Sequence, residues 1–129
     1  MVAVDTNVVV RLLTRDDETQ YQASYALFKA EEIFIPESVI LETAWVLEYA
    51  YHFAPAAMCA ALRKLLGLNN VHLASPAELA KVLEWHEAGL DFADALHLAR
   101  CQHLPQFKTF DERFIRRAQG LSGCVVAKP

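Results

Sequence analysis

The sequence of 129 residues is long enough for one domain with a hydrophobic core. With 54% hydrophobic and 22% charged residues, it is typical of a folded globular protein and not of a disordered chain. The formal net charge of −4 excludes a simple basic protein that coats nucleic acid, but it allows an enzyme whose carboxylates hold a metal ion.

Neither a membrane span nor a secretion signal is visible in the sequence. No apolar run is long enough to cross a bilayer, and the N-terminus lacks the basic start of a signal peptide, so we expect a cytoplasmic protein. Cys59, Cys101 and Cys124 are widely spaced, which is neither a disulfide framework nor a zinc pattern. We expect buried or half-buried thiols.

The predicted elements alternate between strands and helices along the chain. Short apolar runs predict strands at residues 2–4, 33–35, 71–73, 106–109 and 125–126. Apolar periodicity, capping residues and prolines predict helices at residues 8–13, 17–28, 37–51, 55–67, 75–89, 91–101 and 112–118. We therefore expect an α/β fold in one domain over residues 1–129, with a five-stranded, mostly parallel sheet covered by helices on both faces.

Acidic residues follow two of the predicted strands. Asp5 comes directly after the first strand, and Asp111 comes shortly after the fourth. The ends of parallel strands are where α/β folds place ligands. Asp111 can also be the N-cap of the following helix, and both roles can hold together. Thr6 and Asn7 can cap the helix that follows the first strand.

Glu42 lies inside the most apolar helix of the chain. The apolar residues of this helix occupy almost its whole circumference, namely Val39, Ile40, Ala44, Trp45 and Leu47. We therefore expect the helix to be central and Glu42 to have little route to solvent. A carboxylate there is costly unless it is paired or binds a metal. The structural alternatives are that Glu42 snorkels to solvent or pairs with an arginine, and we favour a functional role.

Asp91 and Asp94 are three residues apart and share one face of a predicted helix. Asp91 can serve as a cap or as a favourable charge at the positive helix end, as readily as it can serve in a site. Asp94 lies deeper in an apolar helix, so a capping role explains it less well. Asp94 is therefore the stronger functional candidate of the two.

The combination of these acids predicts a metal site. Carboxylates gathered at one edge of a sheet repel one another and must hold protons or bind a cation. Ligands that are all oxygen favour Mg²⁺ or Mn²⁺ over zinc. Such an ion activates water and stabilises charge on a phosphodiester. The glycine-rich loops of dinucleotide-binding and Walker-type proteins are absent.

Four segments of the chain resemble the ordered acidic motifs of PIN-domain ribonucleases. They are VDTNV at residues 4–8, PESVILE at 36–42, DFADALH at 91–97 and TFD at 109–111. The small size is similar to that of the VapC toxins of VapBC toxin–antitoxin modules. The resemblance implies a PIN-like three-layer sandwich, RNA cleavage that depends on Mg²⁺ or Mn²⁺, a homodimer and inhibition by a VapB-like antitoxin.

The resemblance also implies roles for individual residues. The four acids that map to the metal ligands of the family, and so to its catalytic residues, are Asp5, Glu42, Asp94 and Asp111. Asp91 maps to a position that is acidic in many members and is an auxiliary ligand. The residues beside these acids, which would hold or orient them, are Thr6, Asn7 and Thr109.

Several other side chains are candidates for contacts with RNA or with a partner. Arg113, Arg116 and Arg117 can hold RNA phosphates, although a solvated helix face explains them equally well. His97 can line the pocket, but a packing role is the simpler interpretation. An aromatic stripe can belong to the core, to a partner-binding groove or to a base-stacking surface, and its members are Tyr21, Tyr25 and Phe28.

The predicted function is a metal-dependent endoribonuclease acting on single-stranded or looped RNA, and the toxin of a toxin–antitoxin pair. An RNA-processing nuclease outside such a module is the alternative within the same class. A receiver-like phosphoacceptor domain would need an acidic pair after the first strand and a phosphoacceptor aspartate after a middle strand. Only the single Asp5 ends the first strand, and Pro36-Glu37 follow the second, which disfavours this alternative. A relative that only binds RNA is a further alternative, which the complete set of acids disfavours.

Overall fold

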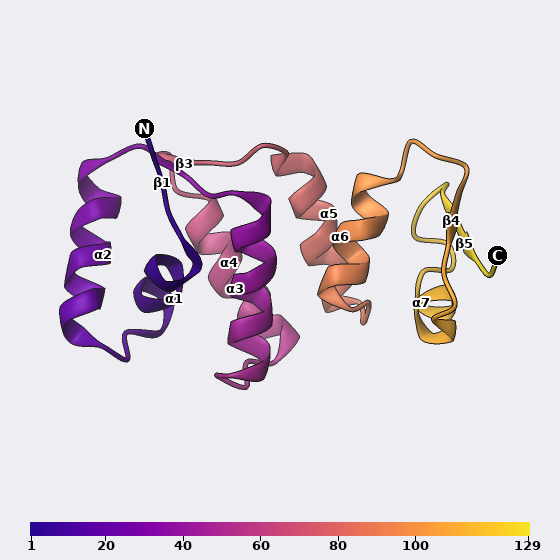
Figure 1. Ribbon diagram of the computed structural model, residues 1–129, viewed down its shortest axis with the longest axis horizontal. Coiled ribbons are helices and arrows are strands. Elements are labelled where there is room, and N and C mark those ends of the chain that lie inside the picture. The colour runs from indigo at the N-terminus through magenta and orange to yellow at the C-terminus, as the bar shows by residue number, and fades with distance from the viewer. The chain divides into compact units, whose positions relative to one another are not determined.

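The computed structural model describes residues 1–129 and contains seven helices and five strands (Figure 1). The chain forms two compact units, residues 1–74 and 75–129, and each is described here by itself. Every strand and helix predicted from the sequence is present, with ends that differ by a few residues. The α/β class and the alternation of elements are therefore confirmed.

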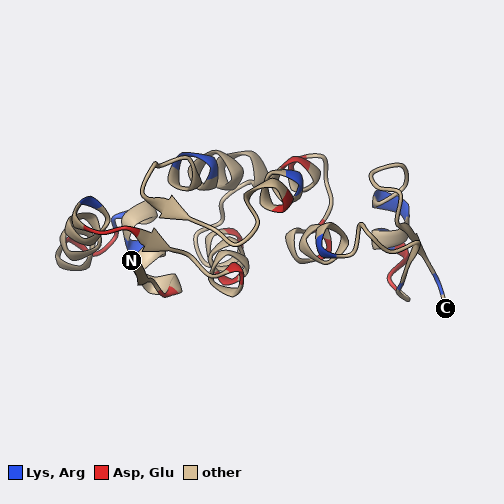
Figure 2. Cartoon of the chain, turned by 90° about the horizontal axis from the view of Figure 1, so that it is seen from above, with Lys and Arg blue, Asp and Glu red and all other residues tan.

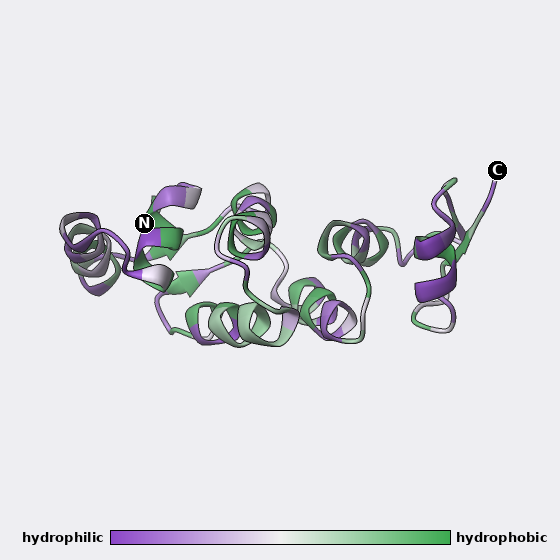
Figure 3. Ribbon diagram, turned by 90° about the horizontal axis from the view of Figure 1, so that it is seen from below, coloured by the Kyte–Doolittle hydropathy of each residue, from purple (hydrophilic) through white to green (hydrophobic).

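A three-stranded parallel sheet forms the centre of the first unit. Its strands are β1 (Val2–Ala3), β2 (Ile33–Phe34) and β3 (Val71–His72), in the order β1-β2-β3. In the middle strand, Ile33 pairs with Val2 on one side and with Val71 on the other. Ile33 is fully buried, and these apolar strands are drawn largely green in Figure 3. The burial is incomplete at the edge of the sheet, because Val2 of β1 is half-buried and Ala3 is exposed.

Four helices surround this sheet in the first unit: α1 (Thr6–Thr14), α2 (Glu18–Ala30), α3 (Glu37–Tyr49) and α4 (Pro55–Leu66). Local signals fix several of their ends. Asp17 caps α2 by accepting a 3.0 Å hydrogen bond from the amide of Gln20. Pro55 opens α4, and Gly67 follows its last residue. The largest fully buried residues of these helices are Val9, Val10, Leu47, Met58 and Leu62.

Helix α3 is not buried on all sides, which corrects the expectation of an all-round apolar contact. Its buried residues are Ile40, Thr43, Ala44 and Leu47. Trp45 and Tyr49 leave 61% and 56% of their surface exposed. An aromatic residue in an apolar helix is normally predicted to belong to the core, but Trp45 and Tyr49 lie on the face of α3 that is turned away from its buried residues. Amphipathic packing therefore decides the orientation of α3.

The second unit begins with a pair of helices, α5 (Pro76–Glu87) and α6 (Phe92–Arg100), which lie side by side (Figure 1). The turn between them passes through Gly89, whose φ of 113° is favourable only for glycine. His86 and Leu90 lie on either side of this glycine. The ring Nδ1 of the buried His86 donates a 2.7 Å hydrogen bond to the carbonyl oxygen of Leu90.

The rest of the second unit contains β4 (Gln106–Lys108), α7 (Glu112–Arg117) and β5 (Val125–Ala127). The strands β4 and β5 form a parallel pair of their own. The ring of Phe107 lies 6.2 Å from that of His97 and 5.4 Å from that of Phe114, measured between centroids. These aromatic contacts join β4 to α6 and to α7.

The prediction of one five-stranded sheet is wrong. The five strands form a three-stranded sheet in the first unit and a two-stranded sheet in the second. Each strand has only two or three residues, so few ladder hydrogen bonds determine its partner, and each pairs with strands of its own unit. The single PIN-like domain over residues 1–129, and the three-layer sandwich implied by the resemblance, stay predictions.

The prediction of buried or half-buried free thiols is confirmed. All three cysteines are free; Cys59 and Cys124 are buried, and Cys101 is half-buried. No helix is long and apolar enough to span a bilayer.

Candidate active site in two acidic groups

The first acidic group consists of Asp5, Thr6 and Glu42, in the first unit. Asp5 is the N-cap of α1, and its Oδ1 accepts a 2.7 Å hydrogen bond from the amide of Thr6. The hydroxyl of the buried Thr6 donates a hydrogen bond to Oε1 of Glu42. One threonine therefore connects the acid after β1 with the acid on α3.

This arrangement corrects two expectations about the first group. The N-cap of α1 is Asp5, not Thr6 or Asn7, because the helix begins directly at Thr6. Glu42 is exposed, although the apolar helix predicted little route to solvent. Its carboxylate is stabilised by the Thr6 hydroxyl and by water, so burial does not force it to bind a cation or an arginine. Asn7 is exposed beside Asp5.

The second acidic group consists of Asp91, Asp94 and Asp111, in the second unit. Asp91 is the N-cap of α6, and its Oδ1 lies 3.1 Å from the amide of Asp94. Asp111 is the N-cap of α7, and its Oδ1 accepts bonds of 3.0 Å and 3.1 Å from the amides of Arg113 and Phe114. In both caps the backbone amides of the helix donate their hydrogen bonds to Oδ1 of the aspartate, so that Oδ2 is available for another ligand.

Burial is the main influence on the carboxyl group of Asp94, and the charges of Asp91 and Asp111 add to it. Burial, together with the charges of Asp91 and Asp111, raises the pKa of the half-buried Asp94 to about 6. His97 acts in the opposite direction and lowers this pKa. The structure thus brings together three acids that the sequence placed in two separate segments.

The neighbours of the second group occupy specific places. Thr109 Oγ1 accepts a 3.0 Å hydrogen bond from the amide of Asp111, so Thr109 shapes the loop that carries this acid. Arg113, Arg116 and Arg117 are exposed on α7, where basic residues are dense in Figure 2. A Cβ atom added at Gly89 would lie 2.5 Å from Nη1 of Arg117. The guanidinium of Arg117 therefore lies against the turn that leads to Asp91.

The chemistry of these donors fits a hard divalent cation, although no ready-made metal site is formed. No three His, Cys, Asp or Glu side chains are arranged together as a metal site. The second group nevertheless offers only oxygen ligands, and burial, together with the charges of Asp91 and Asp111, raises the pKa of Asp94. A cation would offset these negative charges.

The sequence from residue 2 to residue 120 matches the PIN domain family. The chain belongs to the PIN-domain family. PIN domains are nucleases that generally depend on a divalent metal ion, so membership supports a nuclease, and hence a hydrolase, role. Among curated proteins, none matches the chain significantly.

The matched residues of the PIN domain include both acidic groups and all four motifs in their expected order. One feature of this domain was not predicted from the sequence, namely the exposed aromatic face of α3 formed by Trp45 and Tyr49. The spacing of Glu42, Trp45 and Tyr49 at i, i+3 and i+7 was the available signal, because these positions share one side of a helix.

The raised pKa of Asp94 predicts an unusual effect on stability. An aspartate ionises near pH 3.8 when unfolded but near 6 in the folded PIN domain, so folding loses stability as the pH rises through this window. Asp94→Asn removes the buried charge and should stabilise the protein at pH 7 by about 1 kcal/mol after allowance for solvent screening. The difference should vanish below about pH 4.

Urea unfolding of wild type and Asp94→Asn across this pH range measures the effect. Glu84→Gln, a change at an exposed acid of α5, is the matched control for the loss of a carboxylate outside the second acidic group. If the change in the free energy of unfolding caused by Asp94→Asn does not vary with pH, the raised pKa of Asp94 is contradicted.

Proposed function

We propose that the protein is a metal-dependent endoribonuclease that hydrolyses RNA phosphodiester bonds and acts as the toxin of a toxin–antitoxin pair. The observation that carries the nuclease proposal is the match of residues 2–120 to the PIN domain family, which includes the second acidic group. Carboxylates placed in this way are suited to a divalent cation and poorly suited to remain together without one.

The resemblance of the acidic motifs to those of the family supports Asp5, Glu42, Asp94 and Asp111 as the proposed ligands of Mg²⁺ or Mn²⁺, with Asp91 as an auxiliary. When bound, the ion supplies Lewis acidity toward water and positive charge toward the phosphodiester. The protein's part is to hold its carboxylates in fixed positions, because geometry decides whether a hard cation binds.

Hydrogen bonds already in the structure perform this positioning. The Thr6 hydroxyl fixes one oxygen of Glu42, and the helix amides of α1, α6 and α7 fix one oxygen each of Asp5, Asp91 and Asp111. Arg117, held against the turn before Asp91, is placed to contact a substrate phosphate near the second group. Arg113 and Arg116 are further candidates for phosphate contacts.

Single-stranded or looped RNA is the proposed substrate. The protein carries a net charge of −4, and its basic residues are distributed over the helices of both units (Figure 2). Such a surface does not suit a long duplex, which is bound mainly through its phosphates. An unpaired strand also offers its bases, which an A-form duplex keeps in a deep groove.

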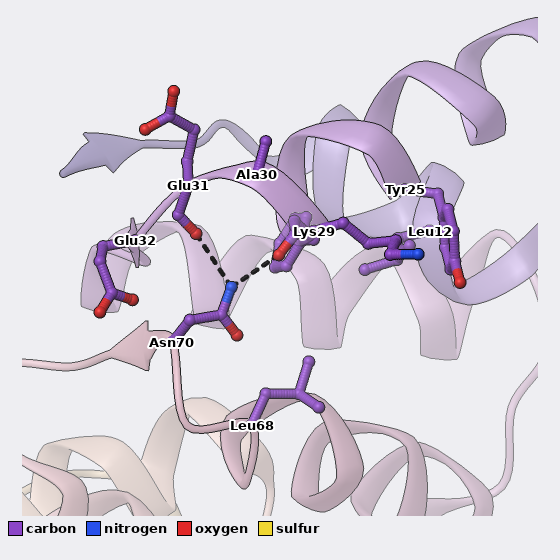
Figure 4. Close-up of a pocket in the computed structure, with 9 residues that line it drawn as sticks. Leu12, Tyr25, Lys29, Ala30, Glu31, Glu32, Leu68 and Asn70 are labelled. Atoms are coloured by element: carbon purple, nitrogen blue, oxygen red, sulfur yellow. Dashed lines mark hydrogen bonds between the residues drawn. The ribbon is translucent and has the colours of Figure 1, made fainter.

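A VapB-like antitoxin and a second copy of the chain are the proposed protein partners. The first unit has a largely apolar hollow of about 540 Å³. The side-chain amide of Asn70, which lines it, donates hydrogen bonds to the carbonyl oxygens of Phe28 and Glu31 (Figure 4). Tyr25 and Phe28 from the aromatic stripe line this hollow, which supports binding of an apolar partner segment. A short neighbouring gene for a DNA-binding protein would favour the toxin role over general RNA processing.

The requirement for a metal ion provides the direct test of this function. The purified protein should cleave a mixed RNA pool in Mg²⁺ or Mn²⁺, lose this activity in EDTA and regain it when the ion is restored in excess. Gel electrophoresis of end-labelled RNA measures the cleavage. Asp94→Asn, purified in parallel, identifies any contaminating ribonuclease.

Two results would contradict the proposal. Cleavage that persists in EDTA would show that no divalent ion is required. Absence of cleavage with every RNA tested, by a protein whose circular dichroism shows intact helices, would favour the alternative of a protein that only binds RNA.

A further inference from the structure

The last part of the chain is basic, although the protein as a whole is acidic. Residues 101–129 contain five lysines and arginines against two acids, which gives a formal charge of +3. Residues 1–100 contain seven against fourteen, which gives −7. We call residues 101–129 the basic segment, and Figure 2 shows its basic residues on α7 and near the C-terminus. An anionic ligand is therefore attracted to this part of an otherwise acidic protein.

Helix α7 carries most of this charge. Arg113, Arg116 and Arg117 are spaced at i, i+3 and i+4, so they share one side of the helix, and all three are exposed. Glu112 forms a 2.7 Å ion pair with Lys128 and not with an arginine. No ion pair of the structure involves Arg113 or Arg116. Their guanidinium groups can therefore bind the phosphates of a ligand.

Phe110 is the most exposed large apolar residue of the protein, and it lies in the same segment. It is 80% exposed, whereas Phe114, four residues later, is 3% exposed. The rings of Phe107 and Phe114 contact each other, with centroids 5.4 Å apart. These two neighbouring phenylalanines therefore pack inside the segment, while the ring of Phe110 lies in solvent.

The loop that carries Phe110 is held on both sides. The amide of Thr109 donates a 3.0 Å hydrogen bond to the carbonyl oxygen of Ala127, and the amide of Asp111 donates one of 3.0 Å to Thr109 Oγ1. Asp111 in turn caps α7 through its Oδ1. Phe110 thus lies on a fixed loop, directly before a proposed metal ligand and the helix that carries the three arginines.

The combination of an exposed ring with unpaired cations favours single-stranded RNA as the ligand. An apolar peptide would contact the ring of Phe110 but would leave the arginines of α7 without an anionic partner. A nucleic-acid duplex would bind the arginines, but its bases are already stacked on one another. An unpaired strand offers both a flat base and a phosphate in every nucleotide.

We propose that Phe110 is a stacking site for an unpaired base of single-stranded RNA whose phosphates are bound by the arginines of α7. This inference rests on the proposed nuclease function and deepens it. It assigns the residue that selects unpaired RNA, and it places one nucleotide of the substrate beside Asp111.

Strands with and without bases separate stacking from charge. The probes are a labelled oligoadenylate and a labelled strand of the same length and charge that lacks its bases. The protein is full-length Asp94→Asn, so that the RNA is not cleaved. Fluorescence anisotropy should show about tenfold tighter binding of the oligoadenylate, because this is the effect expected for stacking on one base.

Variants of Phe110 should change only the contribution of the base. In the Asp94→Asn background, Phe110→Ala should bind the oligoadenylate about tenfold more weakly and bind both strands equally. Phe110→Trp keeps an aromatic ring and should keep the preference for bases. Leu104→Ala removes another exposed apolar side chain of the basic segment and should leave both affinities unchanged.

The dependence of affinity on salt tests the arginines. Each phosphate contact with a single strand contributes about 0.7 to the slope of log affinity against log salt concentration. Replacing Arg113 and Arg116 together by glutamine should reduce this slope by about 1.4 and weaken both strands alike. Phe110→Ala should leave the slope unchanged, as should Lys81→Gln, which removes an exposed charge from α5.

Several results would overturn the inference. Equal affinities of Phe110→Ala and Phe110→Trp for the oligoadenylate, or equal affinities of the parent protein for the two strands, exclude stacking on Phe110. An unchanged slope in the double arginine variant excludes the phosphate contacts. Self-association without RNA that Phe110→Ala abolishes, measured by sedimentation, would show that a second copy covers the ring. If wild type still cleaves RNA in these cases, only this inference fails; absence of both cleavage and RNA binding refutes the nuclease function as well.

Discussion

Asp94→Asn is expected to reduce metal-dependent RNA cleavage by at least about a hundredfold. Asparagine keeps the shape of the side chain and one oxygen acceptor, but it removes the negative charge that a hard cation requires. Asp94 is half-buried, so water has limited access to take the place of the lost ligand. The initial rate of cleavage of a labelled oligonucleotide, measured over a range of Mn²⁺ concentrations, gives the loss.

The fold should survive this substitution, since Asp94 caps no helix itself and its charge is unfavourable in the folded state. Glu84→Gln, on the exposed face of α5, is the control for loss of a carboxylate and should retain wild-type rates. Full activity of Asp94→Asn would refute the assignment of Asp94 as a metal ligand.

Asp5 is both the N-cap of α1 and a proposed metal ligand, so its substitution must keep the cap. Asparagine is as good an N-cap as aspartate, so Asp5→Asn should preserve α1 and remove only the charge. Asp17→Asn changes the cap of α2 in the same way and controls for any effect of capping.

Gly89→Ala is expected to destabilise the protein by about 1–3 kcal/mol, which is a large part of the stability of a small domain. Gly89 has a φ of 113°, where a side chain is strained. The added Cβ would also lie 2.5 Å from Nη1 of Arg117, so that this guanidinium must move. The midpoint of urea unfolding measures the loss.

Two other glycines provide controls for this prediction. Gly123→Ala meets nothing within 4 Å and has no positive φ, so it should be neutral or slightly stabilising. Gly120→Ala has a φ of 75° and open space, so it isolates the backbone strain from the contact with Arg117. Unchanged stability of Gly89→Ala would contradict the described turn between α5 and α6.

The sequence predicted the elements well because their signals are local. Pro55 and Gly67 bound α4, and Asp17 and Asp111 cap helices as their positions indicated. Strand pairing is different, since β1 pairs with a strand some 30 residues away and β4 pairs with β5. Strands of two or three residues carry too little pattern to specify such partners, and the expectation of one sheet was wrong for that reason.

The acidic site was predictable in part for the same reason. The pair Asp91 and Asp94 follows from helical spacing, and Asp111 is both a cap and a member of the second acidic group. The exposure of Glu42 and Trp45 was not predictable from composition, because apolar content shows that a helix packs but not which side does so. Only the contacts of α3 with its neighbours decide that question.

The helix caps described above have a consequence for how RNA is held. The N-terminal amides of a helix ordinarily attract a phosphate. At α1, α6 and α7, carboxylates of the protein itself already accept hydrogen bonds from those amides. At these three helix ends, the acids thus take the place that a phosphate would occupy. If the proposed RNA substrate binds near them, we expect arginines or a cation to hold it, and such contacts weaken as the salt concentration rises.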